Sequence, residues 1–592
     1  MKYPELTEIY TSREMIDVFG GYNHNLRIGS GEFYDMKNMT SDDYPVLSPR
    51  KQRGTYASPT NPVGIIAKDA LCHVDCVVAE HYEGARFYIN GKEVEDFELS
   101  SKAEDCPKTL VSMGAYVIIL PDKMYVNTEN PTDHGSLDET VTTTSEVEFS
   151  LCKIDGSAYP NVKRSSTAPT EPQNLALWMD ISGATPVLRQ YSATSGEWVS
   201  VATTYIKIYS EGSSIGKPFS VGDGVTISGI DIADLEGLNS TMVVWDNGDD
   251  YIVVTGIVES KYKTNAAITI ERRMPKMDFV IEAGNRLWGC NYGLSNDGVT
   301  VNEIYASKLG DFKNWNCFAG ISTDSYAASV GTDGQFTGAI THLGYPIFFK
   351  ENCIHKVYGN YPANYQIQTT TCRGVQKGCE RSLAIVNETL FYKSRTSVCA
   401  YDGSLPTEVS SALGDVQYSN AVAGVLGNKY YISMKEAGGD YSLFVFDTKK
   451  GMWHREDNTQ VVDFCTNKGE LFYIDYGDKD IKTVLGTGEL DTSPVEWEAI
   501  TGIIGTDSPD KKYISRMDVR LSLNVGTRVS IFADYDSLGS WEHLFSMTGT
   551  TLRSFAIPIR PKRCDHLRLK IMGVGEAKIF SITKTVEQGS DV

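Results

Sequence analysis

Short runs of alternating apolar and polar residues, separated by small-residue turns, fill most of this 592-residue chain. In its second half one unit keeps returning: a small-residue turn, a β-rich run, a polar turn and a second β-rich run. The copies begin at Gly284, Gly344, Asn387, Gly427 and Lys468, so successive starts are 60, 43, 40 and 41 residues apart. About 40–50 residues is the length of one four-stranded propeller blade. Because one such sheet cannot bury both of its faces alone, the repeat predicts an all-β fold built on a β-propeller.

The first part of the chain has two predicted segments. Residues 1–60 read as an extended N-terminal arm, since their prolines disfavour helix, with one short helical turn expected at residues 11–19. Such an arm can cross a propeller or reach a neighbouring subunit. Strand–turn–strand signals over residues 61–134, including the hairpin turn Asn90-Gly91, predict the first propeller blades.

Three further segments follow. A polar stretch breaks the blade period, and strand signals such as Tyr205-Ile-Lys-Ile-Tyr come after it, so residues 135–275 are expected to form an inserted β domain that projects from the propeller. The remaining blades are expected over residues 276–492. Clear alternation over residues 493–592, as in Arg516-Met-Asp-Val-Arg-Leu, predicts a C-terminal β-sandwich.

Charge and hydropathy exclude some classes of protein. The formal net charge is −21 and no long basic run occurs, so tight nucleic-acid binding is not expected. An acidic wall would instead repel DNA and let it slide past, although acidic surfaces also keep many proteins soluble. No apolar run approaches the roughly 20 residues that span a bilayer, and the start has no apolar signal region. We therefore expect synthesis in a cytoplasm without a membrane anchor.

The twelve cysteines are interpreted as buried free thiols of a reducing compartment, because most lie in apolar strand-like runs. The tightest cluster is Cys72-His73-Val-Asp-Cys76, and one further pair is Cys372 and Cys379. A structural zinc site usually needs two close pairs, so no metal is predicted. Asp246-Asn-Gly-Asp-Asp250 resembles half of a calcium loop but lacks the spaced glutamate, which favours a turn.

No motif for nucleophilic, phosphate-binding, dinucleotide-binding or zinc-protease chemistry occurs, so no catalytic, cofactor-binding or metal residues are predicted. Propeller glycosidases work with paired carboxylates, which makes acidic residues near predicted strand ends worth weighing. Among 76 acidic residues such coincidences are inevitable, and solvated loop positions are favoured. The carboxylates concerned are Glu388, Asp402, Asp447, Glu456 and Asp457.

Several stretches resemble tail proteins of bacteriophages and prophages, specifically the nozzle or tail-hub stabilisation proteins of short-tailed phages. The similarity is clearest over about residues 280–490, while the 135–275 block matches no named domain. The stretches are Asn285-Arg-Leu-Trp-Gly, Glu303-Ile-Tyr-Ala-Ser-Lys-Leu-Gly-Asp-Phe-Lys-Asn-Trp, Ile347-Phe-Phe-Lys-Glu-Asn-Cys-Ile-His-Lys-Val-Tyr-Gly, Ala400-Tyr-Asp-Gly, Lys37-Asn-Met-Thr with Leu47-Ser-Pro-Arg50, and Ile579-Phe-Ser-Ile-Thr-Lys-Thr with Gly589-Ser.

The resemblance implies a structural protein of the virion tail, assembled in the bacterial host cytoplasm, and not an enzyme. In that family, six copies form a ring below the head-to-tail adaptor, and the ring retains and then conducts the genome. The implied partners are further copies of the chain, adaptor and portal proteins, tail fibres or spikes, and passing double-stranded DNA that is not held tightly. Two alternatives remain: a tail-tip or fibre-like receptor- or glycan-binding protein, and, less favoured, a propeller glycosidase. Blade number, ring order and host stay open.

Overall fold

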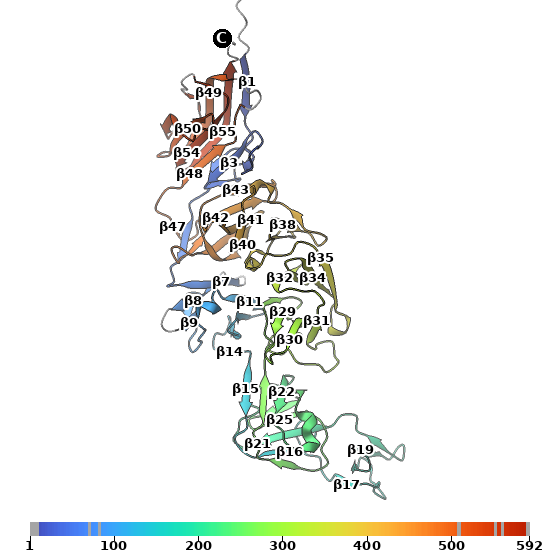
Figure 1. The fold of residues 1–592 in the computed structure, drawn as a ribbon. Helices are drawn as coiled ribbons and strands as arrows, with labels where there is room; N and C mark the ends of the chain where they lie inside the picture. The colour runs from blue at the N-terminus through green and yellow to red at the C-terminus, as the bar shows by residue number, and fades with distance from the viewer. Residues whose placement is uncertain are drawn as a thin grey trace, which may run out of the picture.

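The computed structural model describes residues 11–68, 73–80, 84–505, 511–549, 553–557 and 562–587. These residues are almost entirely β-strands and turns, with a few short 3₁₀ helices, so the predicted all-β class is confirmed. No helix in this part of the chain is long and apolar enough to span a bilayer. Figure 1 shows three parts in a row: sheets formed by both chain ends, a ring of sheets, and a separate group of strands.

The middle part is a propeller-like ring, in which seven sheets of the described residues follow one another around a common axis. Each sheet is an antiparallel meander, and its first strand lies nearest the axis. The innermost strands, in order around the ring, are β7 (Pro62–Lys68), β11 (Thr109–Met113), β28 (Phe279–Glu282), β32 (Phe336–His342), β36 (Ala384–Val386), β40 (Tyr418–Leu426) and β44 (Val461–Asn467).

The outer strands of each sheet follow one another along the chain, most of them through short turns. They are β8 (His73–Glu80), β9 (Gly84–Ile89) and β10 (Lys92–Glu93); β12 (Tyr116–Leu120), β13 (Met124–Asn127) and β14 (His134–Ser136); β29 (Leu287–Leu294), β30 (Thr300–Ala306) and β31 (Tyr326–Ser329); β33 (Tyr345–Lys350), β34 (Cys353–Tyr358) and β35 (Gln366–Thr371); β37 (Thr389–Lys393), β38 (Val398–Tyr401) and β39 (Thr407–Glu408); β41 (Lys429–Glu436), β42 (Tyr441–Asp447) and β43 (Met452–Arg455); and β45 (Glu470–Asp475) and β46 (Ile481–Thr483). The longer segment 307–325 separates β30 from β31.

The last sheet of the ring is completed by the N-terminal part of the chain. Strand β6 (Gly54–Ala57) pairs antiparallel with β46 on one side and with β47 (Glu489–Leu490) on the other. A ring closed in this way leaves no open seam between the first and last sheets, and β44 lies directly against β7. The segment 1–60, expected to be an extended arm, thus includes a strand that closes the ring.

The two chain ends form a second group of sheets, which we call the terminal sheets. Strand β1 (Thr11–Ile16) pairs with β55 (Ala577–Glu587), so the helical turn expected at residues 11–19 is wrong. Its partner lies more than 560 residues away, and burial against that strand outweighs local helix propensity. The other strands are β2 (Gly21–Tyr22), β3 (Glu32–Lys37), β48 (Glu496–Thr501), β49 (Lys512–Leu523), β50 (Arg528–Tyr535), β51 (Glu542–Thr548), β52 (Arg553–Ile557), β53 (Arg563–Cys564) and β54 (Leu567–Val574).

One of these sheets is continuous with the ring. Strands β40 to β43 continue through β2 and β3 into β48, β54, β50 and β51, giving ten hydrogen-bonded strands. A single apolar core runs along both sides of this junction and includes Trp453 of the ring and Trp497 of the terminal sheets. The ring and the terminal sheets are therefore joined by a backbone ladder and a shared core.

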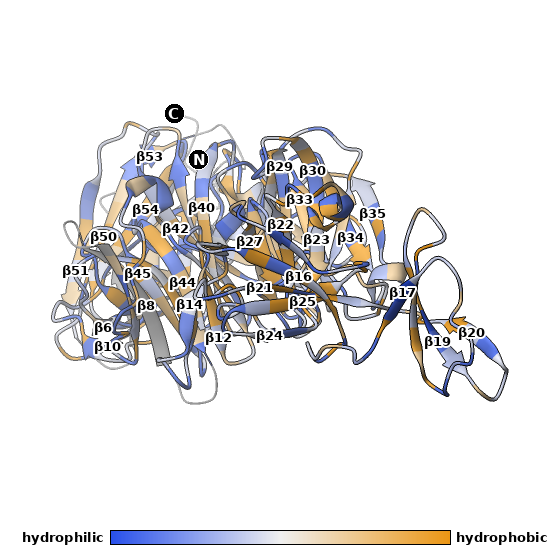
Figure 2. Ribbon diagram, turned by 90° about the horizontal axis from the view of Figure 1, so that it is seen from below, coloured by the Kyte–Doolittle hydropathy of each residue, from blue (hydrophilic) through white to orange (hydrophobic). Residues whose placement is uncertain are grey.

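Residues 139–272, which we call the distal unit, lie at the opposite end of the molecule (Figure 1). Two sheets enclose a separate apolar core, and a third small sheet projects from them at one side (Figure 2). The strands are β15 (Glu139–Thr142), β16 (Val147–Cys152), β21 (Tyr205–Ser210), β22 (Gly224–Ser228), β23 (Thr241–Val243), β24 (Asp246–Gly248), β25 (Tyr251–Thr255), β26 (Tyr262–Thr264) and β27 (Thr269–Arg272), with β17 (Lys163–Ser165), β18 (Leu177–Asp180), β19 (Val187–Ser192) and β20 (Glu197–Ser200) in the projecting sheet.

A buried polar network docks the distal unit onto the ring. Asp223 forms a 2.6 Å ion pair with Arg272 and accepts a 2.8 Å hydrogen bond from the side-chain amide of Asn314, which follows β30. The side-chain amide oxygen Oδ1 of Asn314 accepts a 2.9 Å hydrogen bond from the Gly224 backbone N–H. These charged and amide groups are satisfied by one another, so their burial fixes how the distal unit sits.

Candidate functional site

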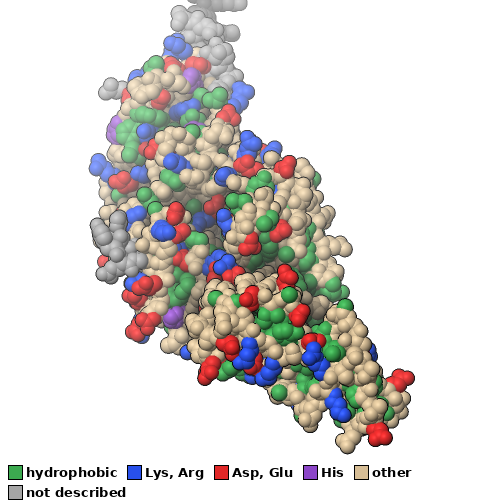
Figure 3. All heavy atoms as spheres, turned by 60° about the horizontal axis from the view of Figure 1, so that its bottom comes forward, with side chains coloured by type: hydrophobic (Ala, Val, Ile, Leu, Met, Phe, Trp, Pro, Cys, Tyr) green, Lys and Arg blue, Asp and Glu red, His purple; other side chains and the backbone are tan. Residues whose placement is uncertain are grey.

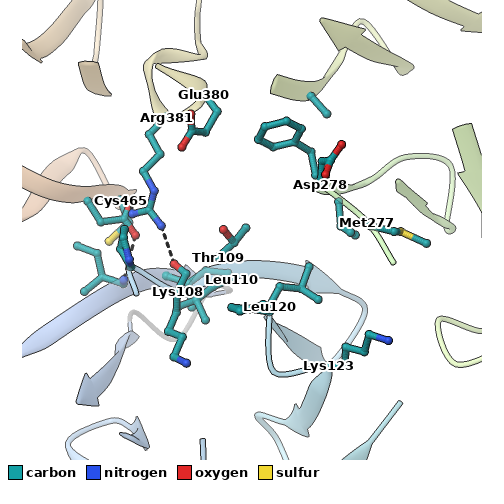
Figure 4. Close-up of a pocket in the computed structure, with 18 of the residues that line it drawn as sticks. Lys108, Thr109, Leu110, Leu120, Lys123, Met277, Asp278, Glu380, Arg381 and Cys465 are labelled. Atoms are coloured by element: carbon teal, nitrogen blue, oxygen red, sulfur yellow. Dashed lines mark hydrogen bonds and ion pairs between the residues drawn. The ribbon is translucent and has the colours of Figure 1, made fainter. Parts of the chain in front are cut away.

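A large cavity of about 690 Å³ lies on the axis of the ring. Its walls come from β7, β11, β28, β32 and β44 and from the 3₁₀ turn η4 (Glu380–Ser382). Figure 4 shows charged side chains reaching into it from several sheets. Because ligands of propellers and other closed β structures bind in such central cavities, this cavity is the candidate functional site.

Arg381 on η4 connects sheets across this cavity. Its guanidinium donates a 2.8 Å hydrogen bond to the Lys108 carbonyl and a 3.0 Å bond to the Val462 carbonyl, and one nitrogen lies 3.5 Å from an Asp463 carboxylate oxygen. The other Asp463 oxygen accepts a 3.2 Å bond from the Ile65 backbone N–H. Arg381 and Asp463 thereby join the fifth sheet to the first, second and seventh.

Two carboxyl groups of the cavity have raised pKa values. Burial raises the pKa of Asp463, and the attraction of Arg381 offsets only part of that rise. Burial also raises the pKa of Asp278, whose carboxylate accepts a 3.0 Å bond from the Tyr292 backbone N–H. A glycosidase needs a proton donor of this kind, but here both groups accept backbone hydrogen bonds that hold the sheets in place.

Two other charged residues of the cavity form ion pairs within the protein. Lys108 is fully buried and pairs at 2.7 Å with Asp122, and Lys123 pairs at 2.8 Å with Asp138. The Glu380 side chain has no hydrogen-bond or ion-pair partner among the described residues. Figure 4 shows Arg381 and Asp278 on different walls of the cavity. The arrangement stabilises the ring, and it does not present two facing carboxyl groups free of other contacts.

The five carboxylates weighed from sequence do not meet at one site. Asp402 accepts bonds from Ser404 in an exposed turn, and Glu388 lies in the β36–β37 hairpin. The solvated positions favoured for Glu456 and Asp447 are wrong, because only 2% and 4% of these residues is exposed. Glu456 and its neighbour Asp457 instead bind arginines that precede β6.

The cysteine and calcium-loop candidates have structural roles. The ten cysteines among the described residues have free thiols, and burial raises the pKa of Cys372 and Cys379. Asp249 and Asp250 form the turn between β24 and β25. Cys72 lies outside the described residues, and so do the side chains of His73 and Cys76. Within the described part, no three His, Cys, Asp or Glu side chains are grouped to hold a metal ion.

The residues that dominate the cavity, Arg381, Asp463 and Asp278, were not predicted from sequence. None belongs to a recognisable motif, and their contacts join strands far apart in the chain. The one available signal is the apolar run before and after Asp463, in which a single charged residue interrupts a strand-like stretch.

The fold and this cavity define the chain as an all-β, propeller-like protein. No protein-family model and no curated protein matches it. Similar solved structures include an exo-β-1,3-galactanase from Phanerochaete chrysosporium, with 9% identity and a TM-score of 0.21 over 52% of this chain and 94% of that one. A Trypanosoma rangeli sialidase has 9% identity and a TM-score of 0.22 over 97% of this chain and 96% of that one. Likenesses at such scores carry no argument about function.

Proposed function

We propose that this chain is a structural subunit of a bacteriophage tail, and that six copies form a ring below the head-to-tail adaptor. The ring would retain the genome and conduct it during ejection. In fold terms we propose a seven-bladed propeller with an inserted β domain at residues 135–275 and a C-terminal β-sandwich. Portal and adaptor proteins would meet one end of the ring, and tail fibres or spikes would attach to its outside.

The observation that carries this proposal is the arrangement of the three parts in one row, with the terminal sheets at one end and the distal unit at the other (Figure 1). A rigid, elongated subunit of this kind suits a ring in which one lateral contact repeats around an axis. The ten-stranded sheet joins the ring of sheets to the terminal sheets by a continuous hydrogen-bonded ladder. Such a subunit can transmit force along the tail.

Two of the stretches that resemble phage tail proteins lie side by side in the structure, which supports the proposal. Leu47 and Ile579 exchange two backbone hydrogen bonds of 3.1 and 2.9 Å, and Lys578 pairs with Asp43 at 2.7 Å. The N- and C-terminal stretches are thus joined by a backbone bridge and an ion pair. They bring the chain ends together at the terminal sheets.

The size of the axial cavity determines where DNA would pass. A sphere with the volume of the cavity is about 11 Å across, narrower than the roughly 12 Å major groove of B-DNA alone. A duplex would therefore have to pass between copies in the ring and not through the axis of a single propeller. The net charge of −21 would keep such a channel from binding the phosphates.

Mass photometry and negative-stain electron microscopy of the purified full-length protein test the proposal. We expect particles of about six copies with a central channel wide enough for duplex DNA, and in intact particles we expect the ring on the tail axis. A protein that stays monomeric at micromolar concentration and occupies peripheral positions on the particle would contradict it. Release of reducing ends from a polysaccharide would favour the glycosidase alternative instead.

A further inference from the structure

A second hollow, of about 540 Å³, lies on the surface of the distal unit. Its floor is the outward face of β16 and β21, where Glu148 pairs with Tyr209 and Ser150 with Lys207. The alternate residues of the same strands point inward and belong to the apolar core. One wall is a strap of residues 153–164, which follows β16. We call this hollow the distal groove.

Tyrosine side chains give the distal groove amphipathic surfaces. Tyr209 on the floor is 37% exposed, and Tyr159 on the strap faces the same space. A tyrosine ring offers an apolar face and a polar hydroxyl, which suits a ligand that is itself part apolar and part polar, such as a sugar ring. Ser150 and Glu148 add hydroxyl and carboxylate groups beside the rings.

Ion pairs hold the walls of the groove in position. Arg164 of the strap pairs with Glu259, and Lys261 pairs with Glu148 at 2.6 Å. These pairs use both carboxylates of the groove. In Figure 3, whose view brings this end of the molecule forward, acidic and basic side chains lie side by side over the distal unit.

Lys207 is the basic residue of the groove that these ion pairs leave without a carboxylate partner. It is half-buried at the centre of the floor, with its ammonium 3.7 Å from the centroid of the Tyr251 ring, and it forms no ion pair with any described residue. The groove therefore contains three cations and two anions in a chain whose net charge is −21. A half-buried lysine beside one aromatic ring favours an anionic ligand, because its charge interacts more strongly there than in water.

We propose that the distal groove binds an anionic saccharide, with Lys207 pairing with a carboxylate or phosphate of the ligand and Tyr159 and Tyr209 contacting its sugar rings. The hollow is within the size range of pockets that enclose a ligand of a few rings. The inference goes beyond the ring proposal, since a monomer would bind the saccharide whether or not rings form.

Calorimetric titration of the full-length protein tests this site with three probes of similar length: an oligogalacturonate, an oligomer of glycerol phosphate, and neutral maltohexaose. We expect at least one anionic probe to bind at least tenfold more tightly than the neutral one. That binding should weaken as salt is raised, because the ligand charge is partly screened. A preference between the two anionic probes tells whether carboxylate or phosphate is recognised.

Matched variants make the result specific to the groove. Lys207→Gln should weaken anionic binding at least tenfold, and Tyr209→Ala should weaken it severalfold. Lys217→Gln, at an exposed lysine of the same unit outside the groove, should change it less than twofold. Equal binding of neutral and anionic probes, no binding of any probe, or equal effects of the two lysine variants would each overturn the proposal. An unchanged melting temperature shows that Lys207→Gln is folded.

Discussion

Replacing Arg53 with methionine tests how the ring of sheets is closed. Arg53 directly precedes β6, and only 4% of it is exposed. Its guanidinium lies 2.6 Å from Glu456 and 2.9 Å from Asp457, in the connection between the sixth and seventh sheets. It also donates a 3.1 Å hydrogen bond to the Thr459 hydroxyl. Methionine keeps the length of the side chain but leaves the buried Glu456 carboxylate and the partly buried Asp457 carboxylate facing an apolar group.

The expected loss of stability in the Arg53→Met variant follows from the burial of these charges. Removing one partner of a buried ion pair costs about 3–5 kcal/mol, because the other charge stays desolvated. Arg50 lies 3.7 Å from Glu456 and 3.5 Å from Asp457, so it compensates in part and favours the lower end of that range. About 300 residues in the ring have an unfolding entropy of about 0.6 kcal/mol/K, so a loss of 3–5 kcal/mol lowers the melting temperature by about 5–8 °C.

The pKa of Asp457 gives a second value for the free energy that this ion cluster contributes. Burial alone would raise this pKa, but Arg53, the Thr459 hydroxyl and Arg50 outweigh burial and lower it from 3.8 to about 2. A carboxyl group with a depressed folded-state pKa stabilises the fold above pH 3.8, and this stabilisation is lost as the pH falls towards 2. At about 1.4 kcal/mol per pKa unit, Asp457 alone accounts for roughly 2–3 kcal/mol.

Differential scanning calorimetry at pH 7 measures the change, and hydrogen exchange of β6 locates it. The matched control is Arg373→Met, which breaks a 3.0 Å pair with Glu408 in which both side chains are about half exposed. Such a surface pair contributes at most about 1 kcal/mol to stability, so the melting temperature of the Arg373→Met variant should fall by less than about 2 °C. If both variants melt at the same temperature and β6 exchanges as in the wild type, the ion cluster does not hold the closing strand and the reasoning is refuted.

Three further outcomes are expected from single changes. Burial, with Lys429 nearby, lowers the pKa of His454 from 6.5 to about 3. The neutral imidazole therefore stabilises the fold above pH 6.5, and this stabilisation is lost as the pH falls. In urea unfolding, His454→Phe should reduce the slope of the unfolding free energy against pH by about 1.4 kcal/mol per pH unit between pH 5.5 and 4. Arg381→Ala should lower the unfolding free energy by about 2–4 kcal/mol, and adding Asp463→Asn should recover part of it, because the unpaired buried charge is removed. Leu343, exposed at a backbone φ of 52°, should give up to about 1 kcal/mol of added stability when replaced by asparagine, measured in the same assay.

The turns of the ring were predictable because their chemistry is local. Every repeated unit in the sequence begins at the hairpin between the first and second strands of a sheet, where the backbone adopts positive φ angles. Glycine and asparagine take up such angles at little cost, so they mark these turns in the sequence. The residues concerned are Gly284, Asn285, Leu343, Gly344, Asn387, Glu388, Gly427, Lys468 and Gly469, with φ between 46° and 80°.

Strand pairing between segments far apart in the chain could not be predicted from local sequence patterns. The residues of β6 carry no sign that they complete a sheet whose other strands lie more than 400 positions later. Strand β1 looked like a helical turn because its partner β55 cannot be inferred from spacing. The burial of Glu456 has the same cause, since Arg53 is 403 residues away in sequence. A carboxylate near a strand end is solvated by default, and only a distant arginine reverses that expectation.

A fixed orientation of the distal unit matters if the ring and saccharide proposals both hold. The network around Asp223 and Asn314 docks this unit onto the third sheet, so the distal groove keeps one direction relative to the ring. Repeating the subunit around an axis would then repeat the groove in a circle at one end of the assembly. A single groove with one unpaired lysine is expected to bind weakly. Several grooves engaging one polysaccharide surface would bind it 10²–10⁴-fold more tightly without any new contact, because the later binding events become intramolecular. A weak site on each copy is therefore sufficient for firm but reversible attachment of the assembled ring.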